Sequence, residues 1–152
     1  MSKILVIDDD PGITLLLKRI IAKKGHDILI ASNGLEGLKL AQEEVPDLIF
    51  TDVRMPDLGG VELAGFIKSD PNLQHIPVII LSGTAYMLDL EKTAADNILT
   101  KPFALKSVYG ILDYYLGQEG NETESKKEDS ELKGTKPTFP SISESSQGYT
   151  SN

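Results

Sequence analysis

The feature of this sequence that most constrains its fold is an alternation, through residues 1–117, of short apolar runs with longer stretches of helical spacing. The longer stretches carry apolar residues at i, i+3 and i+4, as residues 13–21 do, which is typical of a helix with one buried face. The apolar runs predict strands at residues 3–7, 27–31, 47–51, 77–81 and 97–100. Five strands that alternate with five helices indicate an α/β fold whose parallel sheet is covered by helices on both faces.

Local signals place the ends of the expected helices. The first helix is expected between Pro11 and Gly25, because Asp10 suits the N-cap, Pro11 the first helical position and Gly25 the stop. Asp10 therefore has a structural role, and we do not count it among the candidate site residues. Further helices are expected at residues 33–44, 60–68, 85–94 and 105–116, of which 85–94 has the least regular pattern.

Polar side chains follow four of the five predicted strands, at the point where each strand ends. They are Asp8 and Asp9 after the first strand, Asp52 after the third, Ser82 after the fourth and Lys101 after the fifth. Ligands of such sheets bind beyond the carboxyl ends of the strands. A single Asp or Ser at a strand end is ordinary turn chemistry, whereas five polar side chains at one edge indicate a site.

The residue types at this edge predict a specific chemistry. Three neighbouring carboxylates repel one another unless a cation compensates their charge, and Mg²⁺ binds to a few carboxylates together with water and phosphate oxygens. Lys101 adds a positive charge that can pair with a phosphate, and Ser82 can donate a hydrogen bond to a phosphoryl oxygen. Since an Asp carboxylate is a competent nucleophile toward phosphorus, these residues predict metal-assisted phosphoryl transfer.

Four segments give the sequence a family resemblance that covers roughly residues 2–117. They are ILVIDDD at 4–10, DLIFTDVRMPDLGG at 47–60, PVIILSG at 77–83 and ILTKPF at 98–103. In combination these segments are specific, and the chain resembles the CheY-like receiver domains of response regulators in two-component signalling. The resemblance implies a flavodoxin-like, doubly wound sheet with the strand order 2-1-3-4-5, flanked by five helices.

The resemblance also implies a role for each carboxylate. Asp52 is similar to the phosphoacceptor that takes a phosphoryl group from the phosphohistidine of a sensor histidine kinase or a histidine phosphotransfer protein. Asp8 and Asp9 resemble the acidic pair that holds Mg²⁺ together with the acceptor, and the backbone carbonyl of Arg54 corresponds to a further metal ligand. Such a domain catalyses only its own phosphorylation and dephosphorylation, so we do not expect an enzyme that acts on other substrates.

The remaining roles concern the phosphoryl group. Ser82 and Lys101 resemble the family's switch residue and its phosphoryl-binding lysine. The peptide bond between Lys101 and Pro102 is expected to be cis, as in relatives, and only an X–Pro bond adopts this form at low cost. Arg54 and Thr84 lie two residues after the acceptor and after the switch residue, at positions that modulate dephosphorylation in the family.

Two positions depart from the family pattern. Ile98 lies three residues before the lysine, where many relatives have an aromatic residue that changes rotamer on activation. Gly59 stands where the usual motif has Asp, and this glycine is expected to loosen the start of the next helix.

The resemblance also implies how the domain signals. A conformational shift is expected in the face formed by the helix at 85–94, the last strand and the last helix, and an unidentified partner protein is expected to respond to it.

Other classes of protein fit the sequence less well. A haloacid-dehalogenase-like phosphatase needs a D-x-D-x-[TV] run after the first strand, and a dinucleotide-binding domain needs G-x-G-x-x-G there; neither pattern is present. A pseudo-receiver that only binds partners usually lacks an acceptor or an acidic residue, and none is missing here. The sequence does not distinguish a receiver with an effector partner from a phosphate-sink or relay receiver.

Composition changes sharply at Gly117. Residues 118–152 contain 11 Ser or Thr and few apolar side chains, which predicts a disordered acidic tail after a receiver domain at 1–117. The chain has no cysteine and no apolar run long enough to span a bilayer. Its net charge is −8. We therefore expect a cytoplasmic protein, monomeric or dimeric on phosphorylation, that binds neither membrane nor nucleic acid directly.

Overall fold

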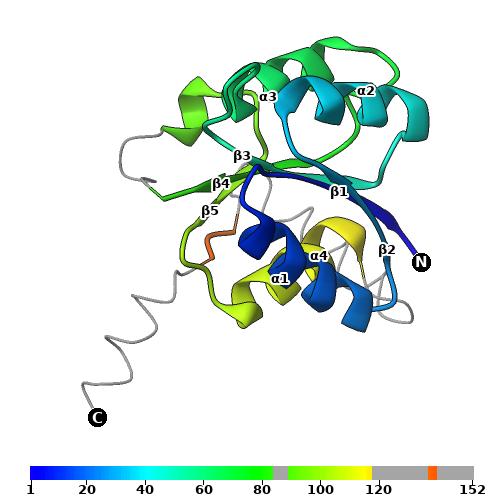
Figure 1. The fold of residues 1–152 in the computed structure, drawn as a ribbon, viewed down its shortest axis with the longest axis vertical. Helices are drawn as coiled ribbons and strands as arrows, with labels where there is room; N and C mark the ends of the chain where they lie inside the picture. The colour runs from blue at the N-terminus through cyan, green and yellow to red at the C-terminus, as the bar shows by residue number, and fades with distance from the viewer. Residues whose placement is uncertain (84–88, 118–136, 140–152) are drawn as a thin grey trace.

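The computed structural model describes residues 1–83, 89–117 and 137–139, and its centre is a five-stranded parallel sheet (Figure 1). The strand order is β2-β1-β3-β4-β5, so the direction of winding reverses beside β1. This confirms the predicted doubly wound, flavodoxin-like sheet. The strands are β1 (Lys3–Ile7), β2 (Asp27–Ala31), β3 (Leu48–Asp52), β4 (Val78–Ser82) and β5 (Asn97–Thr100).

Helices cover both faces of the sheet, as the alternating pattern predicts. Figure 1 shows α2 and α3 above the sheet and α1 and α4 below it. Within the described residues, none of the helices has both the length and the apolarity needed to cross a membrane. The four α-helices of the described residues are α1 (Pro11–Lys23), α2 (Gly34–Glu44), α3 (Gly60–Ser69) and α4 (Leu105–Leu116).

The sheet separates two apolar cores. One core contains Leu17 of α1, Val108 of α4 and Phe50 of β3. In the other core, Leu63 of α3 packs with residues from the opposite face of the same strands. All five residues of β4 are buried, because the strand lies inside the sheet with helices on both sides. Because helices pack on both faces of the sheet, the ends of its strands are held in fixed positions relative to one another.

Side-chain caps define where two of the helices begin. The Asp10 carboxylate accepts a hydrogen bond from the Gly12 N–H at 2.8 Å, which confirms its role as the N-cap of α1. Asn33 accepts from the Glu36 N–H at 2.8 Å, and the Glu36 carboxylate accepts in return from the Ser32 N–H at 3.3 Å. Reciprocal capping of this kind stabilises the first turn of α2.

The helix expected at residues 85–94 lies only partly within the described residues, because 84–88 are outside them. The described part contains a three-residue 3-10 helix, Leu90–Lys92, in place of an α-helix. The Asp89 carboxylate accepts from the Glu91 N–H at 3.0 Å, and the Thr93 hydroxyl donates to a backbone carbonyl of the same turn. Side chains that bond to nearby backbone groups compete with helical hydrogen bonds, which explains the difference.

Most of the tail expected at 118–152 lies outside the described residues. The exception is Pro137–Phe139, which contacts the domain: Pro137 accepts a hydrogen bond from Asn97 of β5, and Phe139 packs against the core beside α4.

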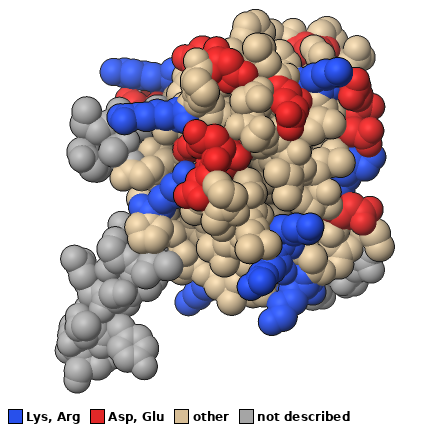
Figure 2. Space-filling view, viewed as in Figure 1, with Lys and Arg blue, Asp and Glu red and all other residues tan. Residues whose placement is uncertain are grey.

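On the domain surface, acidic and basic side chains are interspersed on the face shown in Figure 2, and an acidic group lies near its middle.

Candidate functional site

Three carboxylates meet where β1 and β3 end. Asp8 and Asp9 directly follow β1, and Asp52 is the last residue of β3. One carboxylate oxygen from each residue lies within 4.8 Å of those from the other two. The parallel register pairs Ile7 with Thr51, so that the two strands end at the same level. The structure therefore brings together the three carboxylates that the sequence places at strand ends.

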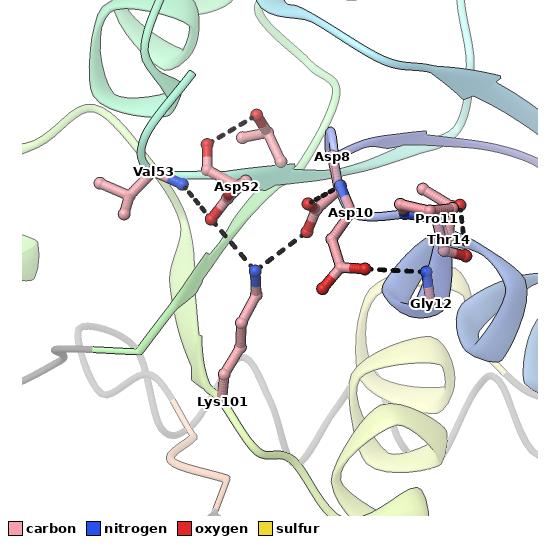
Figure 3. A network of polar contacts seen from close by, with 9 residues as sticks. Asp8, Asp10, Pro11, Gly12, Thr14, Asp52, Val53 and Lys101 are labelled. Atoms are coloured by element: carbon pink, nitrogen blue, oxygen red, sulfur yellow. Dashed lines mark hydrogen bonds and ion pairs between the residues drawn. The ribbon is translucent and has the colours of Figure 1, made fainter. Parts of the chain in front are cut away.

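Lys101 reaches this cluster from the end of β5. Its Nζ donates to Asp8 Oδ2 at 3.0 Å and to Asp52 Oδ1 at 3.2 Å. Figure 3 shows the side chain extending between the two carboxylates, one on each side of the ammonium group. The side chains of Asp8 and Asp52 are 0% and 14% exposed, and that of Lys101 is 21% exposed. Since solvent ions screen buried charges less than surface charges, the attraction between Lys101 and these two carboxylates is only weakly screened.

The burial of this pairing shifts the pKa values of its members. Burial raises the pKa of the Asp8 carboxyl, although a hydrogen bond from the Asp10 N–H and the contact with Lys101 oppose the rise. Burial alone would lower the pKa of Lys101, but the hydrogen bond and charge of Asp8, with the charge of Asp52, raise it above its ordinary value. Lys101 is therefore held in its charged form by the carboxylates.

The charges and donor atoms fit a divalent cation. Three carboxylates and one ammonium group give the cluster a formal charge of −2. All three acidic donors are hard oxygen ligands, the kind that Mg²⁺ prefers. Asp8 is buried and Asp9 is exposed, so the cluster is open to water on the side of Asp9. A cation bound here can keep part of its hydration shell.

Backbone contacts fix the position of Asp52. Its Oδ1 accepts a second hydrogen bond, from the Val53 N–H at 2.9 Å, and the Thr51 hydroxyl donates to its carbonyl oxygen at 3.1 Å. The first residue of α3, Gly60, lies against the same carbonyl, and a Cβ atom there would be 2.3 Å from it. The preceding Gly59 is the N-cap of α3 and provides no side-chain cap. Glycine at position 60 thus lets α3 begin directly beside Asp52.

The other residues predicted at this edge lie on β4 and β5. Ser82 is buried at the end of β4, paired in register with Thr100, and its carbonyl accepts from the Lys101 N–H at 2.8 Å. The peptide bond between Lys101 and Pro102 is cis. Thr84 lies outside the described residues. Ser82 and Lys101 therefore lie at the ends of adjacent strands, on the same edge of the sheet as the carboxylates.

Arg54 lies in the loop between β3 and α3, where its side chain is exposed. This loop and Glu62 of α3 line an open hollow of about 530 Å³, and Arg54 is part of the lining. Val53, which follows Asp52 in the chain, is also part of the lining. The surface around Arg54 is therefore open to solvent two residues after Asp52.

Asp57 is a residue that sequence reasoning missed. Its carboxylate accepts hydrogen bonds from the N–H groups of Gly34 at 3.1 Å, Leu35 at 3.2 Å and Leu58 at 2.7 Å. Desolvation opposes its ionisation, but these hydrogen bonds outweigh it and hold the pKa of Asp57 below the ordinary value. Asp57 thus ties the loop that carries Arg54 to the N-terminus of α2, where a negative charge is favoured. The available signal was its place in the segment at 47–60, which carries part of the family resemblance.

The site of this α/β domain is thus an acidic cluster with a bridging lysine, at the carboxyl edge of a 2-1-3-4-5 sheet. Comparison with known families agrees, because residues 4–113 match the model of the response regulator receiver domain. The chain belongs to this family of two-component signalling domains.

Individual relatives cover the same part of the chain. The polar-differentiation response regulator DivK of Brucella anthropi is 31% identical over 119 residues, which are 76% of this chain and 97% of DivK. Histidine kinase P4 of Formosa agariphila is 39% identical over 108 residues, 69% of this chain but 8% of the kinase. The chain therefore matches a complete small regulator and one small part of a large kinase.

Solved structures share the fold. The response regulator TrrA of Thermotoga maritima, solved in complex with Mg²⁺–BeF, is 34% identical, with a TM-score of 0.67 and coverage of 74% of this chain and 97% of TrrA. The receiver domain of a sensor histidine kinase from Pseudomonas aeruginosa, solved with a magnesium ion in its active-site cleft, has a TM-score of 0.71 at 24% identity. That match covers 77% of this chain and 98% of that domain.

Proposed function

We propose that Asp52 accepts a phosphoryl group from the phosphohistidine of a sensor histidine kinase or a histidine phosphotransfer protein. The observation that carries this proposal is the Lys101 ammonium, which bridges Asp52 and Asp8 within a cluster of three carboxylates. A carboxylate oxygen of Asp52 forms the bond to phosphorus while the phosphorus–nitrogen bond breaks. The imidazole leaves with the electron pair and takes up a proton, and the product is an acyl phosphate.

The surrounding residues position the phosphoryl group. Asp8, Asp9, Asp52 and the backbone carbonyl of Arg54 would hold Mg²⁺, which supplies positive charge to the phosphoryl oxygens. The all-oxygen donor set and the formal charge of −2 support this assignment, as does the Mg²⁺–BeF complex of TrrA. Lys101 exchanges its contact with Asp52 for one with a phosphoryl oxygen.

The other polar residues act on the phosphorylated state. The Ser82 hydroxyl donates a hydrogen bond to a phosphoryl oxygen, which pulls the end of β4 toward Asp52. Arg54 and Thr84 control the access of water and hence the rate of dephosphorylation. The domain catalyses no reaction apart from its own phosphorylation and hydrolysis.

The phosphorylated domain acts through a partner protein. Formation of the acyl phosphate shifts the population of conformers at the face made by residues 85–94, β5 and α4, where the partner binds. Ile98 in β5 is partly buried in the core on the α3 side, so this strand transmits the shift through packing rather than through an aromatic rotamer. The protein acts in the cytoplasm, with residues 1–117 as the receiver and 118–152 as an appended tail.

The proposal is tested by incubation with acetyl phosphate and Mg²⁺, followed by intact-mass measurement. The wild-type chain is expected to gain the mass of one phosphoryl group, and EDTA is expected to prevent the gain. Asp52→Asn is expected to gain none, while Asp27→Asn, at the opposite end of the sheet, is expected to behave as wild type. An equal gain in the Asp52→Asn chain would rule out Asp52 as the acceptor.

A further inference from the structure

Three residues of the tail make contacts that the proposed function does not use. Pro137–Phe139, drawn orange in Figure 1, lies beside β5 on the side of α4. Asn97 Nδ2 donates to the Pro137 carbonyl at 2.9 Å, and Phe139 packs against the core, whereas Thr138 between them is exposed. The segment therefore contacts the domain at two points, and its middle residue is exposed between them.

The polar contact uses a buried and oriented side chain. Asn97 is 4% exposed, and its Oδ1 accepts from the Ile98 N–H at 2.9 Å. One Nδ2 hydrogen can serve Tyr115 Oη, at 3.1 Å, and the other the Pro137 carbonyl. A buried amide of this kind normally has all of its donors satisfied. Asn97 is thus oriented by the domain to hold one carbonyl oxygen of the segment.

The apolar contact depends on a glycine in α4. Apart from the helix itself, the three heavy atoms nearest to a Cβ built on Gly110 all belong to the Phe139 ring. The shortest distances are 2.8 Å to Cε1 and 3.1 Å to Cδ1, so no side chain fits while the ring is in place. Glycine is unfavourable in a helix interior, and here it leaves a flat patch for an aromatic ring.

We propose that Asn97 and Gly110 form a peptide-binding site, which takes a backbone carbonyl followed two residues later by an aromatic ring, and that the chain's own Pro137–Phe139 occupies it. A protein that binds to this part of β5 and α4 must displace the segment. The contacts involve neither Asp52 nor the metal ligands, so the inference does not rest on the proposed phosphorylation.

The occupancy of the site is tested by NMR of the full chain. Phe139→Ala is expected to shift the backbone amide of Gly110, because the ring current is lost, and the side-chain amide of Asn97, because the carbonyl is released. Tyr149→Ala removes another aromatic ring from the tail and is expected to leave both signals in place. Unchanged Gly110 and Asn97 signals in the Phe139→Ala chain would overturn the inference.

A thermal double-mutant cycle provides an independent test. Gly65 in α3 has open space around its Cβ position, so Gly65→Ala is expected to raise the melting temperature by about 4 °C in any background. Gly110→Ala is expected to match that gain in the Phe139→Ala chain but to give a smaller gain, or a loss, when Phe139 is present. An equal effect of Gly110→Ala in both backgrounds would contradict contact with the ring.

Discussion

Asp9 is the residue whose charge the cluster compensates least, since Lys101 contacts the other two carboxylates. Asp9→Asn is expected to raise the free energy of unfolding by roughly 0.5 kcal/mol in EDTA, because it relieves repulsion from Asp8 and Asp52. The same change is expected to remove most of the stabilisation that Mg²⁺ gives the wild type. Urea unfolding in EDTA and in Mg²⁺ measures both effects.

Asp27→Asn is the matched control for this experiment, because it neutralises an exposed carboxylate at the opposite end of the sheet. It is expected to retain the full gain from Mg²⁺. If Asp9→Asn retained that gain as well, Asp9 would not take part in holding the metal.

Tyr115 makes the stability of the protein sensitive to alkaline pH. Burial raises the pKa of Tyr115 to about 12 from an ordinary value of 10.0, although the hydrogen bond from Asn97 opposes the rise. Because the folded state keeps this proton longer than the unfolded state, the contribution is complete below pH 10 and is lost as the pH rises toward about 12. Tyr115→Phe is expected to reduce the decline of stability over this range.

Denaturant unfolding at pH 9 and pH 11 measures the decline. Tyr115→Phe also loses the hydrogen bonds of its hydroxyl group, so it is expected to be about 1 kcal/mol less stable than the wild type at neutral pH. Tyr114→Phe, in the same helix, is the matched control and is expected to follow the wild-type decline. An undiminished decline in Tyr115→Phe would show that this phenol is not responsible.

The position and role of a residue could be predicted where its neighbours in the sequence indicated them. Asp8, Asp52 and Lys101 each follow an apolar strand directly, so their arrival at one edge could be predicted from a parallel sheet. The capping role of Asp10 was equally local and is confirmed. The contacts of Asp57 join segments 22 to 23 residues apart, and no local pattern indicates them.

At the scale of elements, the approach of α3 to β3 determines how Asp52 is presented. A methyl group at Gly60 would meet the Asp52 carbonyl oxygen at 2.3 Å, and backbone atoms cannot rotate away. Gly60→Ala is therefore expected to lower the free energy of unfolding by about 2 kcal/mol and to slow phosphorylation, because the start of α3 and the end of β3 must separate.

Gly65→Ala, in the middle of the same helix, is the matched control. It has open space at Cβ and is expected to stabilise the protein by up to about 1 kcal/mol without changing the rate of phosphorylation. Chemical denaturation and the time course of mass gain with acetyl phosphate check both variants. A Gly60→Ala chain that is as stable as the wild type would contradict the close approach.

Elements with strong periodicity were predicted well, and the exception had weak periodicity. The bounds of β1, β2 and β5 agree with the predicted strands, because apolar runs there are bounded by turn residues. The segment at 85–94 had the least regular apolar pattern, and its described part contains the 3-10 helix Leu90–Lys92. Hydrogen bonds between the backbone and the side chains of Asp89 and Thr93 favour that conformation. The spacing of apolar residues does not predict such bonds.

At the scale of the whole molecule, alternation of strands and helices was sufficient to predict the layered architecture, and the resemblance supplied the strand order. The prediction that the tail is disordered used the average composition of residues 118–152, which treats the whole segment alike. Pro137–Phe139 contacts the domain through one carbonyl and one ring. The average composition of 35 residues does not predict a contact made by three of them. Their docking site on Asn97 and Gly110 exists only in the folded domain.

The measurement that tests the central claim most directly is the location of the phosphoryl group. After reaction with acetyl phosphate and Mg²⁺, borohydride reduces an aspartyl phosphate to homoserine, which peptide mass spectrometry can place in the sequence. We predict homoserine at position 52, dependent on both the donor and Mg²⁺, and none in the Asp52→Asn chain. Homoserine at Asp8 or Asp9, or its absence from a chain that has gained phosphoryl mass, would contradict the account.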